Sequence, residues 1–115
     1  MPIIESGVTD NLEDAKTGVR NGVRFLVDQQ RVKIIKFGIT SNPQKQLRQF
    51  ELEGSRYTHM FLIFKTTLRG DLNLLREYVL ATYPQFCSGE FQNEAEYSGE
   101  IPCFLYCITH LSAKK

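Results

Sequence analysis

Four cationic side chains have the type and placement needed to hold phosphate groups, namely Arg24, Lys36, Lys45 and Arg48. Lys36 is the most informative, because it stands within an otherwise apolar run, where an unpaired charge is costly to bury. A predicted hairpin carries the first two and the helix after it carries the others, and these elements should be neighbours. We therefore predict a nucleic-acid-binding patch of these four residues. The alternative is that they are ordinary solvated charges.

Other residues that could do chemistry give weaker signals. His59 lies close to Arg56 and Tyr57 in the sequence and is a candidate general base, with a half-buried structural histidine as the alternative. Cys103 and Cys107 suggest a zinc site, but four residues of a strand span about 13 Å, too far for two thiolates to bind one ion. We therefore predict that both cysteines are core residues.

The composition describes one small globular domain. The chain has 115 residues, of which 42% are hydrophobic and 23% charged, and its net charge is +1. This balance excludes a global basic field that draws a protein onto nucleic acid, so any such contact must be local. Three cysteines without disulfide spacing, no long apolar run and no secretory leader predict an intracellular protein, cytoplasmic or nuclear, with no membrane partner.

Two apolar segments are expected to form the hairpin that carries the first two cations. Residues 23–27 and 32–39 are rich in β-branched side chains, and a four-residue polar link joins them. So short a link cannot form a parallel crossover, so we predict an antiparallel hairpin. In its second strand Ile35, Phe37 and Ile39 share one face. Because the other face is also apolar, we expect this strand to be central in the sheet.

The helix expected next carries the other two cations. Ser41 or Asn42 can cap its first turn, and Pro43 suits its first position because the missing donor is not needed there. Leu47 and Phe50 give the helix a narrow buried stripe. The remaining side chains of this helix should therefore face solvent.

Two more strands and a second helix complete the predicted domain. Residues 57–65 form a strand in which every second residue faces the same side. Asp71 caps a helix that ends before Pro84, because the residue before a proline is pushed out of the helical region. Residues 101–110 form the last strand.

These elements predict an α/β (α+β) fold, with a small mixed, mainly antiparallel sheet flanked by helices, over residues 21–115. Residues 1–20 form either an N-terminal arm or a short helix capped by Asp10. Residues 88–100 form either a loop or a short hairpin.

The order of these elements resembles the layout of the GIY-YIG nuclease superfamily. Gly22-Val23-Arg24 and Lys36-Phe37-Gly38 stand where the two name-giving tripeptides of that superfamily would stand, at about the expected separation. Residues 39–43 look like the turn after the second tripeptide, and residues 74–80 are similar to the helix that bears the metal-binding glutamate. Gly89-Glu90-Phe91 looks like a motif of a phage-type subgroup.

The resemblance implies roles for particular residues. Active members use two tyrosines beside the scissile phosphate, an arginine on the first helix and a metal-binding glutamate on the second, as phosphodiester hydrolysis requires. Here the tyrosine positions hold Arg24 and Lys36, and the phage-type subgroup often has lysine at the second. The arginine position holds Gln46, while Glu77 matches the glutamate. The resemblance thus assigns catalysis to Lys36 and Glu77, with Mg²⁺ on Glu77.

From these residues we predict a nucleic-acid-binding domain of GIY-YIG nuclease ancestry, with DNA as its expected partner. Its cleavage activity should be weak or lost, because the tyrosines and the arginine are replaced. One alternative is an active metal-dependent DNA endonuclease that uses Mg²⁺ at Glu77. The other is a protein-interaction or regulatory module without nucleic acid, which the near-neutral charge permits.

Overall fold

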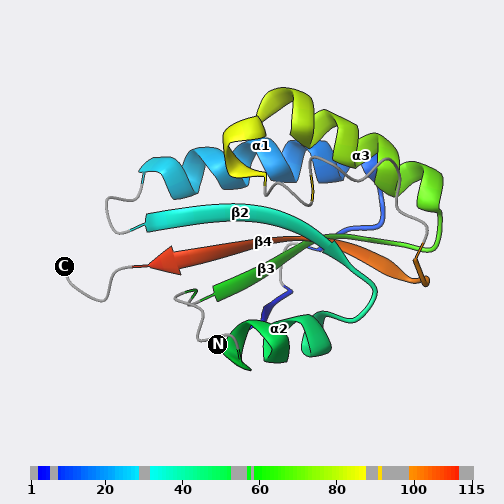
Figure 1. Ribbon diagram of the computed structural model, residues 1–115. Helices are drawn as coiled ribbons and strands as arrows, with labels where there is room; N and C mark the ends of the chain where they lie inside the picture. The colour runs from blue at the N-terminus through cyan, green and yellow to red at the C-terminus, as the bar shows by residue number, and fades with distance from the viewer. Residues whose placement is uncertain are drawn as a thin grey trace.

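A four-stranded sheet with helices on both faces forms the centre of the structure (Figure 1). The computed structural model describes residues 3–5, 8–28, 32–52, 57, 59–87, 91 and 99–111. The elements are β1 (Ile3–Ile4), α1 (Leu12–Asp28), β2 (Val32–Thr40), α2 (Pro43–Leu52), β3 (His59–Thr66), α3 (Arg69–Thr82), the 3-10 turn η1 (Pro84–Phe86) and β4 (Cys103–Leu111). Helices α1 and α3 cover one face and α2 lies on the other. The predicted mixed α/β fold is confirmed.

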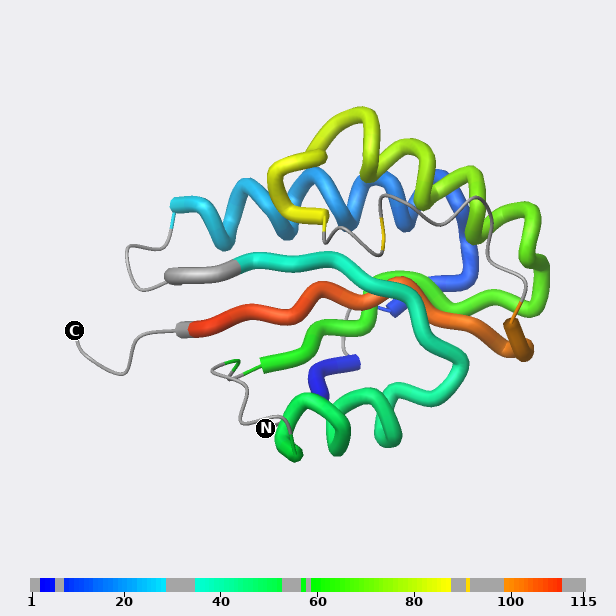
Figure 2. The backbone as a smooth tube through the Cα atoms, in the orientation of Figure 1, coloured from blue at the N-terminus to red at the C-terminus, as the bar shows by residue number. Residues whose placement is uncertain are grey.

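The last strand of the chain lies inside the sheet. The strand order is β1-β3-β4-β2, so β4 runs between β2 and β3 (Figure 2). It is antiparallel to both, whereas β1 and β3 are parallel. Among the described residues, β2 pairs with β4 along its length, and an isolated bridge links Phe37 of β2 to Cys87. The prediction that residues 32–39 form a central strand is therefore wrong, because β4 takes the central place.

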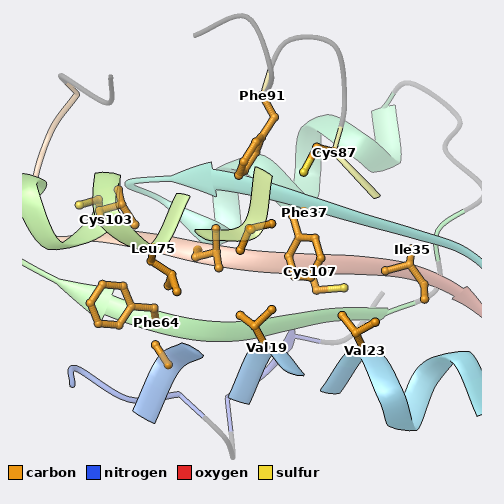
Figure 3. Packing of buried hydrophobic residues seen from close by; sticks show 14 of the residues in the cluster. Val19, Val23, Ile35, Phe37, Phe64, Leu75, Cys87, Phe91, Cys103 and Cys107 are labelled. Atoms are coloured by element: carbon orange, nitrogen blue, oxygen red, sulfur yellow. The ribbon is translucent and has the colours of Figure 1, made fainter. Parts of the chain in front are cut away.

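Residues 23–27 lie in helix α1, so the predicted hairpin with residues 32–39 is wrong. The buried residues of α1 recur at helical spacing and are Ala15, Val19, Val23 and Leu26. Figure 3 shows Val19 and Val23 pointing at the sheet. Burial at steps of three and four residues outweighs the weak strand preference of β-branched side chains, because β-propensity depends strongly on context.

Asparagine side chains cap the first turns of α1 and α2. Asn11 Oδ1 and Asn42 Oδ1 each accept a hydrogen bond from the backbone amide three residues later, at 2.9 and 3.0 Å. The prediction for Asn42 is confirmed, whereas the cap of α1 is Asn11 and not Asp10. Helix α3 begins after Leu68, which makes no side-chain cap bond, and Asp71 lies inside its first turn. The prediction that Asp71 caps α3 is wrong.

Two apolar cores lie on opposite faces of the sheet. The larger core lies under α1 and α3, and the smaller core packs against α2. Met60 and Leu62 belong to the smaller core, but a register shift between Leu62 and Phe64 places Phe64 in the larger one. The prediction of regular alternation along β3 is wrong at this bulge. Cys103 and Cys107 are free, buried thiols of the larger core, which confirms their core assignment (Figure 3).

The phage-type motif falls mostly outside the described residues, since of Gly89-Glu90-Phe91 the structure describes Phe91. That residue is buried, and its carbonyl oxygen accepts a hydrogen bond from Arg76 Nη2 at 2.9 Å. Most of residues 88–100 also fall outside. None of the helices in the described ranges has both the length and the apolar character needed to span a bilayer.

Candidate nucleic-acid interface

The sheet divides the predicted site residues into two groups. Two of them lie in the layer formed by α1 and α3, namely Arg24 and Glu77. Three belong to the opposite side, namely Lys36, Lys45 and Arg48, the last two on α2 (Figure 1). The structure therefore does not bring the four predicted cations together, because Arg24 is separated from the others by the sheet.

Lys36 and Glu77, to which the resemblance assigns catalysis, point away from each other. Lys36 is exposed, and because its neighbour Phe37 points into the larger core, the Lys36 side chain points to the α2 side. Glu77 is exposed on α3, two residues from each of the fully buried Leu75 and Val79, and so lies on the outer side of that helix. Cleavage requires the catalytic side chains to meet at one phosphate. The side chains of Lys36 and Glu77 do not converge in this way.

Helix α1 carries a row of cations that the sequence analysis missed. Lys16, Arg20 and Arg24 follow one another at intervals of four residues, which places them on one side of the helix about 6 Å apart along its axis. The row lies against the C-terminal half of α3. Lys16 Nζ is 5.8 Å from the centre of the Tyr78 ring. Arg20 and Arg24 act electrostatically on the phenol of Tyr83, which follows the last turn of α3.

Tyr83 is a neutral hydrogen-bond donor beside this row. Burial raises the pKa of its phenol above the ordinary value and the Tyr78 phenol acts in the same direction, while Arg20 and Arg24 oppose the rise. The hydroxyl therefore stays protonated at neutral pH. The Tyr83 ring stacks against Phe37 of β2 at 6.4 Å between ring centres. That contact packs the Tyr83 ring against β2.

Little of the positive charge in the row is neutralised within the described part of the chain. Lys16 Nζ lies 3.5 Å from Glu13 Oε2, an exposed pair of the kind that contributes little stability. Arg20 Nη2 donates to Thr17 Oγ1 at 3.4 Å. Neither arginine has an ion-pair partner among the described residues. Within the described ranges, therefore, no carboxylate compensates the charge of Arg20 or Arg24.

Tyr106 is a second residue that the sequence analysis missed. It is the strand partner of Gly38, because β4 fills the place beside β2 that the predicted hairpin gave to residues 23–27. A tyrosine therefore stands next to Lys36-Phe37-Gly38, although it comes from the end of the chain. Sequence spacing could not reveal it, because the spacing does not show which distant strands pair.

The described residues do not form a resident magnesium site. Among these residues, no three or more His, Cys, Asp or Glu side chains form a group that could hold a metal ion. A lone exposed carboxylate such as that of Glu77 binds Mg²⁺ weakly unless a substrate phosphate completes the shell. Mg²⁺ at Glu77 thus stays a prediction that depends on bound nucleic acid. No protein-family model, curated protein or solved structure matches this chain.

Proposed function

We propose that this protein is a nucleic-acid-binding domain of GIY-YIG nuclease ancestry whose cleavage activity is weak or lost. The observation that carries the proposal is the row of Lys16, Arg20 and Arg24 beside Tyr78 and Tyr83. Evenly spaced cations with neighbouring hydroxyl donors hold phosphate oxygens through charge and hydrogen bonds. We expect DNA to lie along the α1 and α3 surface.

The packing of the two helices supports contact with the nucleic-acid backbone. Helices α1 and α3 pack side by side, and the row faces the seam between them. A major groove about 12 Å wide admits one helix, and each helix with its side chains is about 10 to 12 Å across. The pair is therefore too wide to enter a groove together. From this shape we expect contacts to the phosphates and little recognition of the base sequence.

Two observations support the nuclease ancestry with weakened chemistry. The strand, turn and capped helix from β2 to α2 keep the order that the resemblance gives from the second tripeptide onward, and Tyr106 stands beside that tripeptide. The first tripeptide, Gly22-Val23-Arg24, lies in helix α1 and not on the strand that the resemblance implies. Against cleavage, Lys36 and Glu77 do not converge on one phosphate. Binding is therefore the function that the geometry favours over catalysis.

The test compares two triple variants that remove the same charge from opposite sides of the sheet. One is Lys16→Gln/Arg20→Gln/Arg24→Gln on α1, and the other is Lys36→Gln/Lys45→Gln/Arg48→Gln. Labelled duplex, single-stranded and branched DNA are titrated at several salt concentrations. Each lost phosphate contact should reduce the salt slope of binding by about 0.9. The slope of the α1 variant should therefore be smaller than that of wild type by about 2 to 3, whereas the other variant should keep the wild-type slope.

Four outcomes would contradict the proposal. Equal losses in both variants would mean that net charge alone drives binding, and a larger loss in the Lys36 variant would place the interface at α2. Absence of wild-type binding at low salt would leave the protein-interaction alternative. Cleavage is scored in the same samples with magnesium present. Cleavage that disappears in Glu77→Gln would establish an active endonuclease and overturn the weakened chemistry.

A further inference from the structure

A partly open cavity of about 390 Å³ lies between α1 and the sheet. Its walls come from one flank of α1 and from the strands below, and include Gly18, Gly22, Phe25, Ile4, Phe61 and Ile63. The volume lies within the range of small-molecule sites, roughly 300 to 1,000 Å³. The helical spacing of its α1 residues places the cavity on the flank of α1 opposite the cation row.

Two glycines create the hollow. A β-carbon at Gly22 would meet nothing within 4 Å, and one at Gly18 would make an ordinary contact with Ile63 Cγ2 at 3.9 Å. Glycine inside a helix is less favourable than alanine by about 1 kcal/mol, so a larger residue at either position would fit and would strengthen the helix. Voids larger than a water molecule are few in protein interiors. The packing of the domain therefore does not require this space.

The walls limit what the cavity can hold. No charged side chain lines it among the described residues, and its rings come from Phe25, Phe37 and Phe61. Cys107, also in the wall, keeps a neutral thiol, because burial raises its pKa to about 12. An ionised ligand would lose its hydration without a partner. Asn21 is the one described amide side chain in the wall and is exposed.

We propose that this cavity binds an uncharged, ring-containing apolar small molecule with one polar end directed to Asn21. Phe25, which is 62% exposed, would close over the bound ring. The proposal goes beyond nucleic-acid binding and is independent of it, because the cavity and the cation row lie on different flanks of α1.

The test titrates the full chain with N-phenyl-1-naphthylamine, an uncharged probe whose fluorescence rises in apolar sites. Gly22→Leu fills the cavity and should weaken binding at least tenfold, whereas the matched control Gly70→Leu should bind like wild type within twofold. Gly70 is also a helical glycine at which an added β-carbon would meet nothing within 4 Å, but it lies in α3 away from the cavity. Thermal unfolding checks that both variants fold, and neither should melt below wild type.

A second probe tests the charge rule. 8-Anilinonaphthalene-1-sulfonate has a closely related ring system with an added sulfonate, and it should bind at least tenfold more weakly. Comparable binding of the two probes, failure of the neutral probe to bind wild type, or unchanged binding in Gly22→Leu would each overturn the proposal. Sedimentation is run alongside. Probe fluorescence that follows dimer formation would instead identify the cavity as a contact between copies of the chain.

Discussion

Tyr106 and Gly38 are partners on neighbouring strands, and the Tyr106 ring fills the space that a side chain at position 38 would need. The tyrosine is 6% exposed and belongs to the smaller core, where its ring meets Phe50 of α2 edge-on at 6.2 Å between centres. Gly38 thus lets β4 bring a large ring under α2 while keeping its pairing with β2. The glycine of the second tripeptide has a packing role that does not depend on catalysis.

Gly38→Ala should therefore destabilise the protein by about 1 to 3 kcal/mol, as overpacked core substitutions do. Urea unfolding measures the change. Gly22→Ala is the control, and it should be neutral or stabilising by up to about 1 kcal/mol, because its position is open and helical. In a Tyr106→Ala background the cost of Gly38→Ala should largely disappear. An equal cost in both backgrounds would show that the tyrosine is not its cause.

Local signals allowed the segment from β2 to α2 to be predicted. The cap by Asn42, the start of the helix at Pro43 and the burial of Leu47 all depend on residues a few positions apart. The prediction that Cys103 and Cys107 are core residues needed only the residue spacing along a strand. Where one short stretch holds both partners of an interaction, the residue types are sufficient to predict that interaction.

Non-local packing explains the errors. Residues 23–27 have the composition of a strand, but Val23 and Leu26 continue the buried stripe of a helix that begins eleven residues earlier. The central place of β4 and the bulge before Phe64 arise from pairing between distant strands, which sequence spacing does not show.

The error in α1 also hid the candidate interface. A strand over residues 23–27 would place Arg24 with Lys36 of the predicted hairpin partner. The spacing of Lys16, Arg20 and Arg24 at every fourth position was visible in the sequence. It becomes informative when residues 12–28 are taken as one helix, because that period places the three on one side.

Arg24→Gln should lower the salt slope of DNA binding by about 0.9 and reduce affinity several-fold at low salt, because it removes one of the proposed phosphate contacts. Binding is measured by fluorescence anisotropy over a salt series. Arg48→Gln is the matched control, since it removes the same charge from α2 on the opposite side of the sheet. Arg24→Lys should restore the slope. Equal slopes for Arg24→Gln and wild type would remove Arg24 from the interface.

Asn42→Ala should cost about 1 kcal/mol of stability, because it removes the side-chain oxygen that accepts the Lys45 amide at 3.0 Å. Asp71→Ala should cost about 0.5 kcal/mol or less, because Asp71 interacts with the helix dipole without capping α3. Urea unfolding at low and high salt separates the two effects. Salt should screen the Asp71 effect and leave the Asn42 effect unchanged. A cost at Asp71 that equals that at Asn42 in high salt would show that Asp71 does act as a cap.

The buried thiol of Cys107 should make stability fall at alkaline pH. Burial raises its pKa from 9.0 to about 12, while a backbone hydrogen bond with Lys36 opposes the rise, and the residue is 2% exposed. A group whose pKa is higher in the folded state gives its full stabilisation below the unfolded pKa. Between pH 9 and about 12 the unfolded chain ionises first, so stability is lost at about 1.4 kcal/mol per pH unit.

Cys107→Ala should flatten this decline, because alanine has no proton to lose in either state. Urea unfolding of wild type and variant is compared at several pH values between about 8 and 10.5, with a reducing agent and constant ionic strength. Every other side chain is the same in both proteins, so other pH effects cancel in the difference. Cys87→Ala is a second comparison, since burial raises the pKa of that thiol to about 11, so its removal should also flatten the decline over this pH range. Parallel curves for wild type and Cys107→Ala above pH 9 would mean that the Cys107 thiol reaches water in the folded state.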